Sequence, residues 1–284
     1  MSGEIRIGVA GWSYPDWRGV VYPRGCRDEL GWVARYVDFV ELNTTFYRVP
    51  TVDAVESWVE RSAASSLPFT AKLPREVSHE RRVEPALVDA FARALDPLIA
   101  ARRLEALLAQ FNFRFQADRA ALDHLGIVAR AFGDLAPLVV ELRHASWRDA
   151  IGDVRALGFS VANLDYPMRD DGFDGGRGSC GPLGYFRIHG RNRAAWYTKG
   201  AGRDAVYDYE YSPSERDELL DRVRAIAGGD CGTVFVVANN HFRGNAVKLA
   251  LELKAASSGE RVGVPDPLLA AHPSLGAIAR GTLF

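Results

Sequence analysis

Short apolar segments recur along the chain at intervals of roughly 30 residues, each with the length and β-branched content of a buried strand. Most stretches between them have helical periodicity: Val55 and Trp58 share one face of one stretch, and Leu219, Val223 and Ile226 share one face of another. The eight strand candidates are Ile5–Ala10, Phe39–Leu42, Phe69–Leu73, Leu104–Gln110, Leu138–Leu142, Phe159–Leu164, Gly184–His189 and Thr233–Ala238. This alternation predicts an α/β fold, a single (β/α)₈ barrel of the TIM type.

An open, doubly wound sheet is the structural alternative. It is disfavoured because the first strand runs into the sequence GVAGW at residues 8–12 rather than into a glycine-rich dinucleotide-binding turn. No linker divides the chain, so residues 1–284 are expected to form one barrel domain. Residues 258–284 contain several prolines and are expected to pack on the outside of the barrel as a C-terminal extension.

Two helix starts carry capping signals. Asp53 with Glu56, and Ser212 with Glu215, have the spacing of capping boxes, in which each side chain bonds a free backbone N–H of the other residue. Pro213 suits the first position of the second helix.

Two loops break the regular alternation. After the sixth strand, residues 170–178 have the sequence DDGFDGGRG, which predicts a mobile loop in place of a helix. After the seventh strand, a long segment rich in Arg, Trp and Tyr lies between His189 and Ser212. Because loops after barrel strands lie on the catalytic face, both are candidate lids.

Composition and charge narrow the range of functions. The 284 residues carry a formal net charge of −1, which gives no bulk attraction to nucleic acid or to anionic membranes. The cysteines Cys26, Cys180 and Cys231 lack zinc-ligand spacing, and we interpret them as reduced thiols of a cytoplasmic protein. The N-terminus lacks the pattern of a signal peptide, and no apolar stretch reaches the roughly 18 residues of a membrane span.

The expected strand ends are rich in polar and aromatic side chains, where barrel enzymes place their functional groups. These residues are Trp12, Glu41, Asn43, Tyr47, Lys72, Gln110, Glu141, Arg143, His144, Asp165, Arg187, His189, Asn239, Asn240 and His241. Any single pair, such as Glu41 with Lys72, is equally explained as a structural ion pair. Because burying so many polar groups in one layer is costly unless they meet a ligand, a functional pocket is the favoured interpretation.

The residue types assign roles within this pocket. Arginines at strand ends suit phosphate or carboxylate, and a desolvated lysine beside carboxylates can act as acid, base or nucleophile. The predicted catalytic residues are Glu41, Lys72, Glu141 and His189, and the predicted substrate-binding residues are Trp12, Asn43, Tyr47, Gln110, Arg143, Asp165, Arg187, Asn239 and Asn240. The first hypothesis is an enzyme acting on a small anion, possibly nucleotide-like, with Trp12, Tyr47, Trp196 and Tyr197 available for stacking.

Three alternatives stay open. A metal-assisted enzyme, similar to barrel phosphodiesterases, endonucleases or sugar isomerases, would hold a divalent metal with Glu41, Glu141, His144 and His189. The neighbouring cations would repel such a metal, so no metal and no other cofactor is predicted. A non-catalytic binder of anions or nucleic acid is the second alternative, and Schiff-base chemistry through Lys72 is the third. The oligomeric state is not specified by these patterns.

Six segments resemble the YecE-like family, also called domain of unknown function 72. They are GWSY at residues 11–14, ELNTTFY at 41–47, KLP at 72–74, ELRHASW at 141–147, RIHG at 187–190 and NN at 239–240. The stretches around Gln110 and Asp165 depart from the usual family pattern. The resemblance implies a TIM barrel and an intracellular protein. It implies no reaction, since the family has no established activity.

Overall fold

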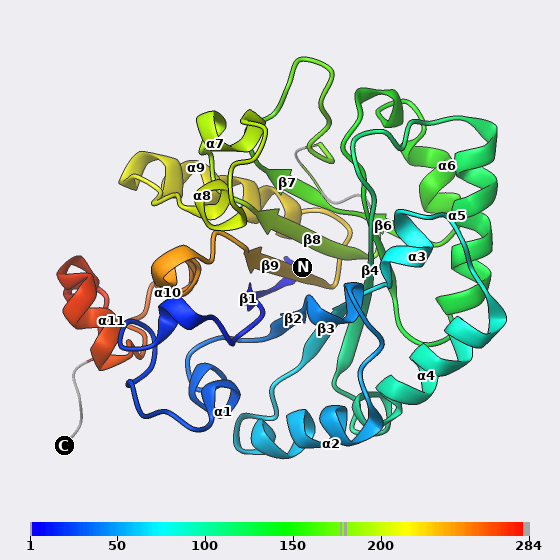
Figure 1. Cartoon of the computed structure of the whole chain (residues 1–284). Coiled ribbons are helices and arrows are strands. Elements are labelled where there is room, and N and C mark those ends of the chain that lie inside the picture. The colour runs from blue at the N-terminus through cyan, green and yellow to red at the C-terminus, as the bar shows by residue number, and fades with distance from the viewer. Residues whose placement is uncertain (1, 177, 179–180, 281–284) are drawn as a thin grey trace.

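Parallel strands form a nearly closed barrel at the centre of the molecule, and helices surround it (Figure 1). The structure is a computed structural model that describes residues 2–176, 178 and 181–280. The strands are β1 (Glu4–Ala10), β2 (Val40–Leu42), β3 (Phe69–Lys72), β4 (Leu104–Gln110), β5 (Leu138–Glu141), β6 (Phe159–Val161), β7 (Asn163–Asp165), β8 (Leu183–Ile188) and β9 (Thr233–Ala238). Each neighbouring pair is parallel, which confirms the predicted TIM-type barrel.

The predicted sixth strand is divided at Ala162 into β6 and β7. Strand β6 pairs with β5 and β7 pairs with β8, so this single segment joins the two edges of the sheet. The Ala162 N–H still donates to the Val140 carbonyl at 2.9 Å, which holds the division against β5. Counting β6 and β7 as one segment leaves the eight strand positions that a TIM barrel requires.

Helices follow most of the strands. They are α1 (Glu29–Val33), α2 (Val52–Arg61), α3 (Arg75–Ser78), α4 (Pro85–Ala100), α5 (Arg119–Phe132), α6 (Ile151–Ala156), α7 (Arg193–Tyr197), α8 (Arg203–Tyr207), α9 (Pro213–Ala227), α10 (Asn245–Ser258) and α11 (Asp266–Ala271). The predicted capping box of Ser212 and Glu215 is confirmed at the start of α9. The one predicted for Asp53 is wrong, because Thr51 caps α2 by accepting from the Ala54 N–H at 3.3 Å.

Side chains alternate between two apolar layers along the strands. The inner layer contains strand-segment residues alone and therefore fills the barrel, whereas the outer layer packs strands such as β8 against helices such as α9. The inner layer consists of Ala10, Phe39, Ala106, Leu108, Val139, Ala162, Leu164, Tyr185, Phe235 and Val237. Because Leu164 belongs to this layer, the next residue, Asp165, faces outward.

The two irregular loops lie where they were predicted. No helix lies between β7 and β8 among the described residues of 166–182. Between β8 and α9, residues 191–211 carry the short helices α7 and α8, and we call this segment the strap. Cys26 and Cys231 are free thiols, while Cys180 and part of the predicted mobile loop lie outside the described residues.

The residues after α10 fold back onto the outer layer. Val262, Leu268 and Leu275 are buried there, and Val262 forms an isolated parallel bridge with Ala279. None of the helices in the described part of the chain combines the length and the apolar composition of a membrane span.

Candidate functional site

Polar side chains from five strands meet at the carboxyl end of the barrel interior. We call this set the polar layer, and it consists of Glu41 on β2, Lys72 on β3, Gln110 on β4, Glu141 on β5 and Arg187 on β8. On β8, Tyr185 belongs to the inner apolar layer, so strand alternation places Arg187 on the same face one step higher. The structure therefore brings together five of the residues that the sequence places at the site.

Arg187 is the central cation of the polar layer. Its Nε and Nη2 atoms donate to the Oε2 and Oε1 atoms of Glu41 at 2.9 and 2.7 Å, and its Nη1 donates to the Oε2 of Glu141. All three side chains are fully buried. Because the guanidinium is occupied on both sides by carboxylates, we infer that Arg187 organises the layer rather than contacting a substrate.

Glu141 receives further donors from its neighbours. The Nε2 of Gln110 and the Nε of Arg143 each donate to its Oε1 at 2.7 Å. Burial raises the pKa of Glu141, but Arg143 and Arg187 outweigh it and hold that pKa well below its ordinary value. A carboxylate so fully compensated is a weak base, so Glu141 acts here as a fixed negative charge.

Lys72 is the cation of the layer without an acidic partner. No carboxylate of the described residues lies within 4.0 Å of its Nζ, which instead sits 4.7 Å from the centre of the Phe46 ring. Burial, followed by repulsion from Arg187, lowers the pKa of Lys72 to about 8. This side chain therefore exchanges a proton near neutral pH.

His189 adds a neutral donor beside the layer. Its Nδ1 contacts the Nδ2 of Asn239 at 2.9 Å, and because an amide nitrogen donates, we assign the imidazole proton to Nε2. That Nε2 lies 3.8 Å from Oε2 of Glu141 and has no hydrogen-bond partner among the described residues. Burial, then Arg187, keeps the pKa of His189 well below its ordinary value, so the ring is uncharged at neutral pH.

A cleft on the β1 and β2 side of the mouth collects three more predicted residues. Its volume is ≈ 190 Å³, and Trp12, Asn43 and Tyr47 line it with Gly11, Ser13, Tyr14 and Thr44. Tyr47 is 66% exposed, and the buried Oδ1 of Asn43 has no hydrogen-bond partner in the described part of the chain. Amide and aromatic groups with unused binding capacity suit the recognition of a ligand.

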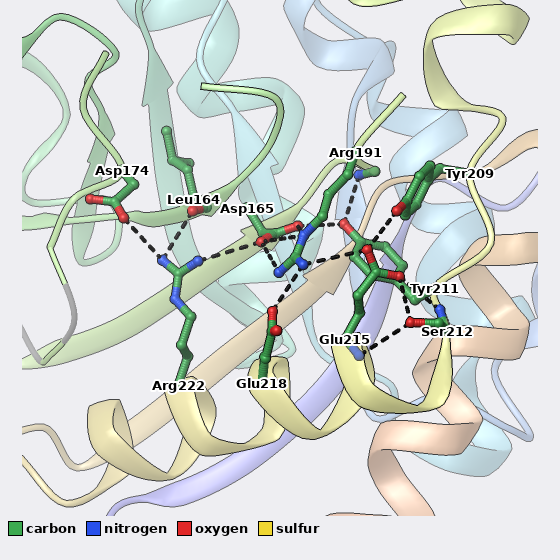
Figure 2. Close-up of polar contacts among 11 residues, drawn as sticks. Leu164, Asp165, Asp174, Arg191, Tyr209, Tyr211, Ser212, Glu215, Glu218 and Arg222 are labelled. Carbon is green, nitrogen blue, oxygen red and sulfur yellow. Dashed lines mark hydrogen bonds and ion pairs between the residues drawn. The ribbon is translucent and has the colours of Figure 1, made fainter. Parts of the chain in front are cut away.

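Asp165 lies outside this site. It accepts from Arg191 Nη2 at 2.9 Å and from the Tyr211 hydroxyl at 2.6 Å, and Arg222 lies 3.5 Å away (Figure 2). Arg191 and Tyr211 are the two ends of the strap. The neighbouring Gly190 fits this closure, since its φ is +91° and its N–H donates to the Tyr211 hydroxyl at 3.0 Å. Asp165 therefore closes the strap from outside the barrel, whereas the sequence placed it among the substrate-binding residues of the pocket.

Replacing Asp165 with asparagine is expected to loosen the strap. The change removes the negative charge that both strap ends share, so amide hydrogen exchange within residues 191–211 should accelerate by about tenfold. Mass spectrometry of exchanged peptides measures this. Glu218→Gln is the matched control, because Glu218 is 62% exposed and bonds Arg191 at one end of the strap, at 2.9 Å, rather than both ends. Equal exchange in the two variants would show that Asp165 does not anchor the strap.

A larger cleft, ≈ 670 Å³, also lies beside Asp165. Arg191, Glu218 and Arg222 line it, so it opens between the strap and α9 rather than over the polar layer. We place the candidate site at the barrel mouth despite the smaller clefts there. The mouth holds the unpaired Lys72 and the unpartnered Nε2 of His189, whereas the charges beside Asp165 are paired with one another.

Two other predicted residues have structural contacts. Asn239 faces inward, and the side chain of Asn240, the next residue, points the other way. Its Nδ2 donates to the Tyr209 carbonyl of the strap at 2.9 Å. The Nδ1 of His144 accepts from the Ser146 N–H at 3.1 Å and so caps a short helical turn. Because His144 is engaged there, the four residues considered as ligands of a divalent metal, Glu41, Glu141, His144 and His189, do not form a single metal site. The described residues contain no group of three or more His, Cys, Asp or Glu side chains that could hold a metal ion.

The structure adds residues that the sequence reasoning missed. The Phe46 ring lies 4.9 Å from the His79 ring, and Lys72 is among the charges that lower the pKa of His79, after burial. Tyr166 continues the inner face of β7 after Leu164, and the Arg143 guanidinium lies 5.4 Å from its ring centre. The two-residue alternation of strand side chains could have predicted the inward direction of Tyr166, because it lies two residues after Leu164. His79 lies seven residues after Lys72, beyond the strand end, where no periodic pattern marks it.

Comparisons with known proteins agree with this architecture. A DUF72 family protein from Thermotoga maritima is 28% identical with a TM-score of 0.77, and the match covers 90% of this chain and 99% of that one. A DUF72 family protein from Enterococcus faecalis is 24% identical with a TM-score of 0.77, covering 89% and 95%. No curated protein matches the chain. The family model described as protein of unknown function DUF72 matches residues 6–273, which confirms the resemblance, and the chain therefore belongs to the DUF72 family.

Proposed function

We propose that this protein is an enzyme acting on a small anionic substrate, bearing phosphate or carboxylate, at the mouth of the barrel. The observation that carries the proposal is the charge balance of the site. Glu41 and Glu141 are compensated by Arg187 and Arg143, and Lys72 is left over as a cation without a carboxylate within 4.0 Å among the described residues. An uncompensated ammonium in a largely buried site attracts an anion strongly, since solvent screens it little.

The groups around Lys72 supply complementary contacts. The N–H assigned to His189 Nε2 is a second donor for an anionic oxygen, and it stays neutral, so it adds no repulsion toward Lys72. The Arg187 fork and the two carboxylates fix the surroundings before any ligand arrives. Preorganised donors of this kind stabilise negative charge that develops in a transition state.

Lys72 also has the properties of an acid–base catalyst. With a pKa of about 8, it is partly neutral near physiological pH and can accept a proton from a bound substrate, then return it. Glu141 is less suited to this role because its pKa is held well below the ordinary value. Lys72 is therefore the proposed acid–base residue, His189 the proposed hydrogen-bond donor, and Glu41 with Glu141 the residues that set their electrostatics.

The pH dependence of anion binding tests the proposal. Methyl phosphate is a dianion above about pH 7, because its second ionisation lies near 6. Its affinity should already be about halved at pH 8, where half of Lys72 has lost its proton, and should fall by about tenfold per pH unit at higher pH. Titration calorimetry between pH 7 and pH 9.5 measures this. An affinity that stays level to pH 9.5, or no measurable binding, would contradict the proposal.

A further inference from the structure

A small cleft of aromatic rings and arginines adjoins the polar layer on the side of β5 and β7. Its volume is ≈ 130 Å³, and we call it the ring cleft. It is lined by Phe113, Arg143, Tyr166, Arg169, Trp196 and Tyr197. These residues come from the loop after β4, the end of β5, the segment after β7 and helix α7 of the strap. Four separate segments therefore converge to build one small aromatic site.

The arginines of the ring cleft lie against its aromatic faces. The guanidinium carbon of Arg143 lies 5.4 and 5.7 Å from the ring centres of Tyr166 and Trp196. That of Arg169 lies 5.4 and 6.0 Å from the ring centres of Phe113 and Tyr197. Guanidinium groups and aromatic rings in contact form flat surfaces that stack on a further ring and attract negative charge.

Two residues of the ring cleft contact the polar layer and His189. Arg143 belongs to both, since its Nε donates to Glu141 of the polar layer at 2.7 Å. The ring centre of Trp196 lies 6.0 Å from that of His189, in an edge-to-face arrangement. A ligand ring stacked on Trp196 beside Arg143 would therefore carry its substituent on the side of His189 and the polar layer, because Trp196 contacts His189 and Arg143 contacts Glu141.

We propose that the ring cleft binds a planar, six-membered aromatic or heteroaromatic ring of the substrate, whose anionic group is held by Lys72 and His189. This inference rests on the proposed function and adds the class of substrate. The size agrees, because a cavity of about 150 Å³ holds one benzene molecule in a well-studied case. The ring surfaces remain accessible: Tyr197 is 42% exposed and Trp196 is half-buried. Phenyl carboxylates, phenyl phosphates and pyrimidine nucleotides share the chemistry that would fit.

Matched ligands with and without a ring test the inference. Titration calorimetry would compare phenyl phosphate with methyl phosphate, which carries the same charge, and uridine 5′-monophosphate would separate a nucleotide from a simple aryl phosphate. We expect at least one of the two ring-bearing ligands to bind about tenfold more tightly than methyl phosphate, the effect of one stacked ring. Trp196→Leu should reduce this advantage to near unity.

Two further variants keep the test decisive. Arg169→Met should also reduce the preference for the ring. Because the Arg169 side chain is 56% exposed, this substitution is not expected to unfold the protein, and a lost preference would reflect the ring cleft itself. Trp32→Leu is the control, because Arg35 lies 4.0 Å from the ring centre of Trp32 on α1, far from α7 in Figure 1. This control should retain the preference.

The outcomes separate the two proposals. Lys72-dependent binding of all three ligands with equal affinity would overturn the ring cleft and leave the anion site standing. A ring preference that survives both Trp196→Leu and Arg169→Met would also overturn the ring cleft. Failure of every ligand to bind would overturn both proposals.

Discussion

Replacing Arg187 with methionine is expected to lower the free energy of unfolding by about 3–5 kcal/mol. The substitution removes the cation between Glu41 and Glu141, two carboxylates that are completely buried. Both charges would then be left without their main compensation in the barrel interior, where an unpaired charge is expensive. Urea denaturation at pH 7, followed by circular dichroism, would give the midpoint and the slope for the variant and the wild type.

A surface arginine provides the control for this experiment. Arg119 is 89% exposed and pairs with Asp123 at 3.0 Å, so Arg119→Met should cost less than about 1 kcal/mol. Adding Glu41→Gln to Arg187→Met should recover part of the loss, since it removes one unpaired charge. If Arg187→Met is as mild as the control, the buried ion pairs do not stabilise the barrel.

The stability of the wild type should also depend on acid pH through Glu141. Its pKa in the folded protein lies well below 4.5, so its contribution is present above that pH and is lost as the pH falls through the lowered pKa. The difference between wild type and Arg187→Met should therefore narrow in acid.

Replacing Lys72 with methionine should change binding and stability in opposite directions. Methyl phosphate loses its ionic contact, which weakens binding by about 10- to 100-fold. The folded protein loses an ammonium whose pKa is lowered to about 8 by burial, and removing it should raise the free energy of unfolding by about 1–2 kcal/mol. Calorimetric titration and urea denaturation of the same preparation would measure the two effects.

Lys254 supplies the matched control for Lys72. Its Nζ pairs with Asp38 at 2.5 Å and it is 32% exposed, so Lys254→Met should lower stability slightly and leave phosphate binding unchanged. A Lys72→Met variant that loses stability together with binding would show that Lys72 is a structural counter-charge of Glu41 and Glu141. In that case the proposed function would lose the observation that carries it.

Strand positions were predictable because buried parallel strands read as apolar runs between turn signals. Strands β4 and β9 begin and end where the sequence places them. Glu41, Glu141 and Arg187 alternate with apolar residues, so their inward direction follows from strand periodicity. The outward direction of Asp165 was not evident, because β6 and β7 carry polar residues on both faces: Ser160 shares the inner face with Leu164, whereas Asn163 and Asp165 lie on the outer face.

The pairing within the site was not predictable from the sequence. Glu41 and Arg187 are 146 residues apart, and they meet because β2 and β8 face one another across the barrel. Which carboxylate pairs with which cation depends on the register of the strands, which sets the height of each side chain along the barrel axis. The same geometry leaves Lys72 unpaired, and this decides the proposed chemistry. The prediction of the α2 cap was wrong for a local reason. Thr51 and Asp53 both have side chains that can cap a helix, and the helix begins two residues earlier than the sequence indicated, so Thr51 is the cap.

The closure of the strap at Asp165 has an evolutionary consequence. The two ends of residues 191–211 are both hydrogen-bonded to one carboxylate on the outer face. They therefore stay close together whatever the length of the segment between them. Lengthening a closed loop costs little entropy, about 0.6 kcal/mol for each doubling of its length. Relatives can therefore exchange this insert, with its aromatic residues, while the strands and their ion pairs stay the same. The residues that the strap presents at the barrel mouth can therefore diverge independently of the strands beneath them.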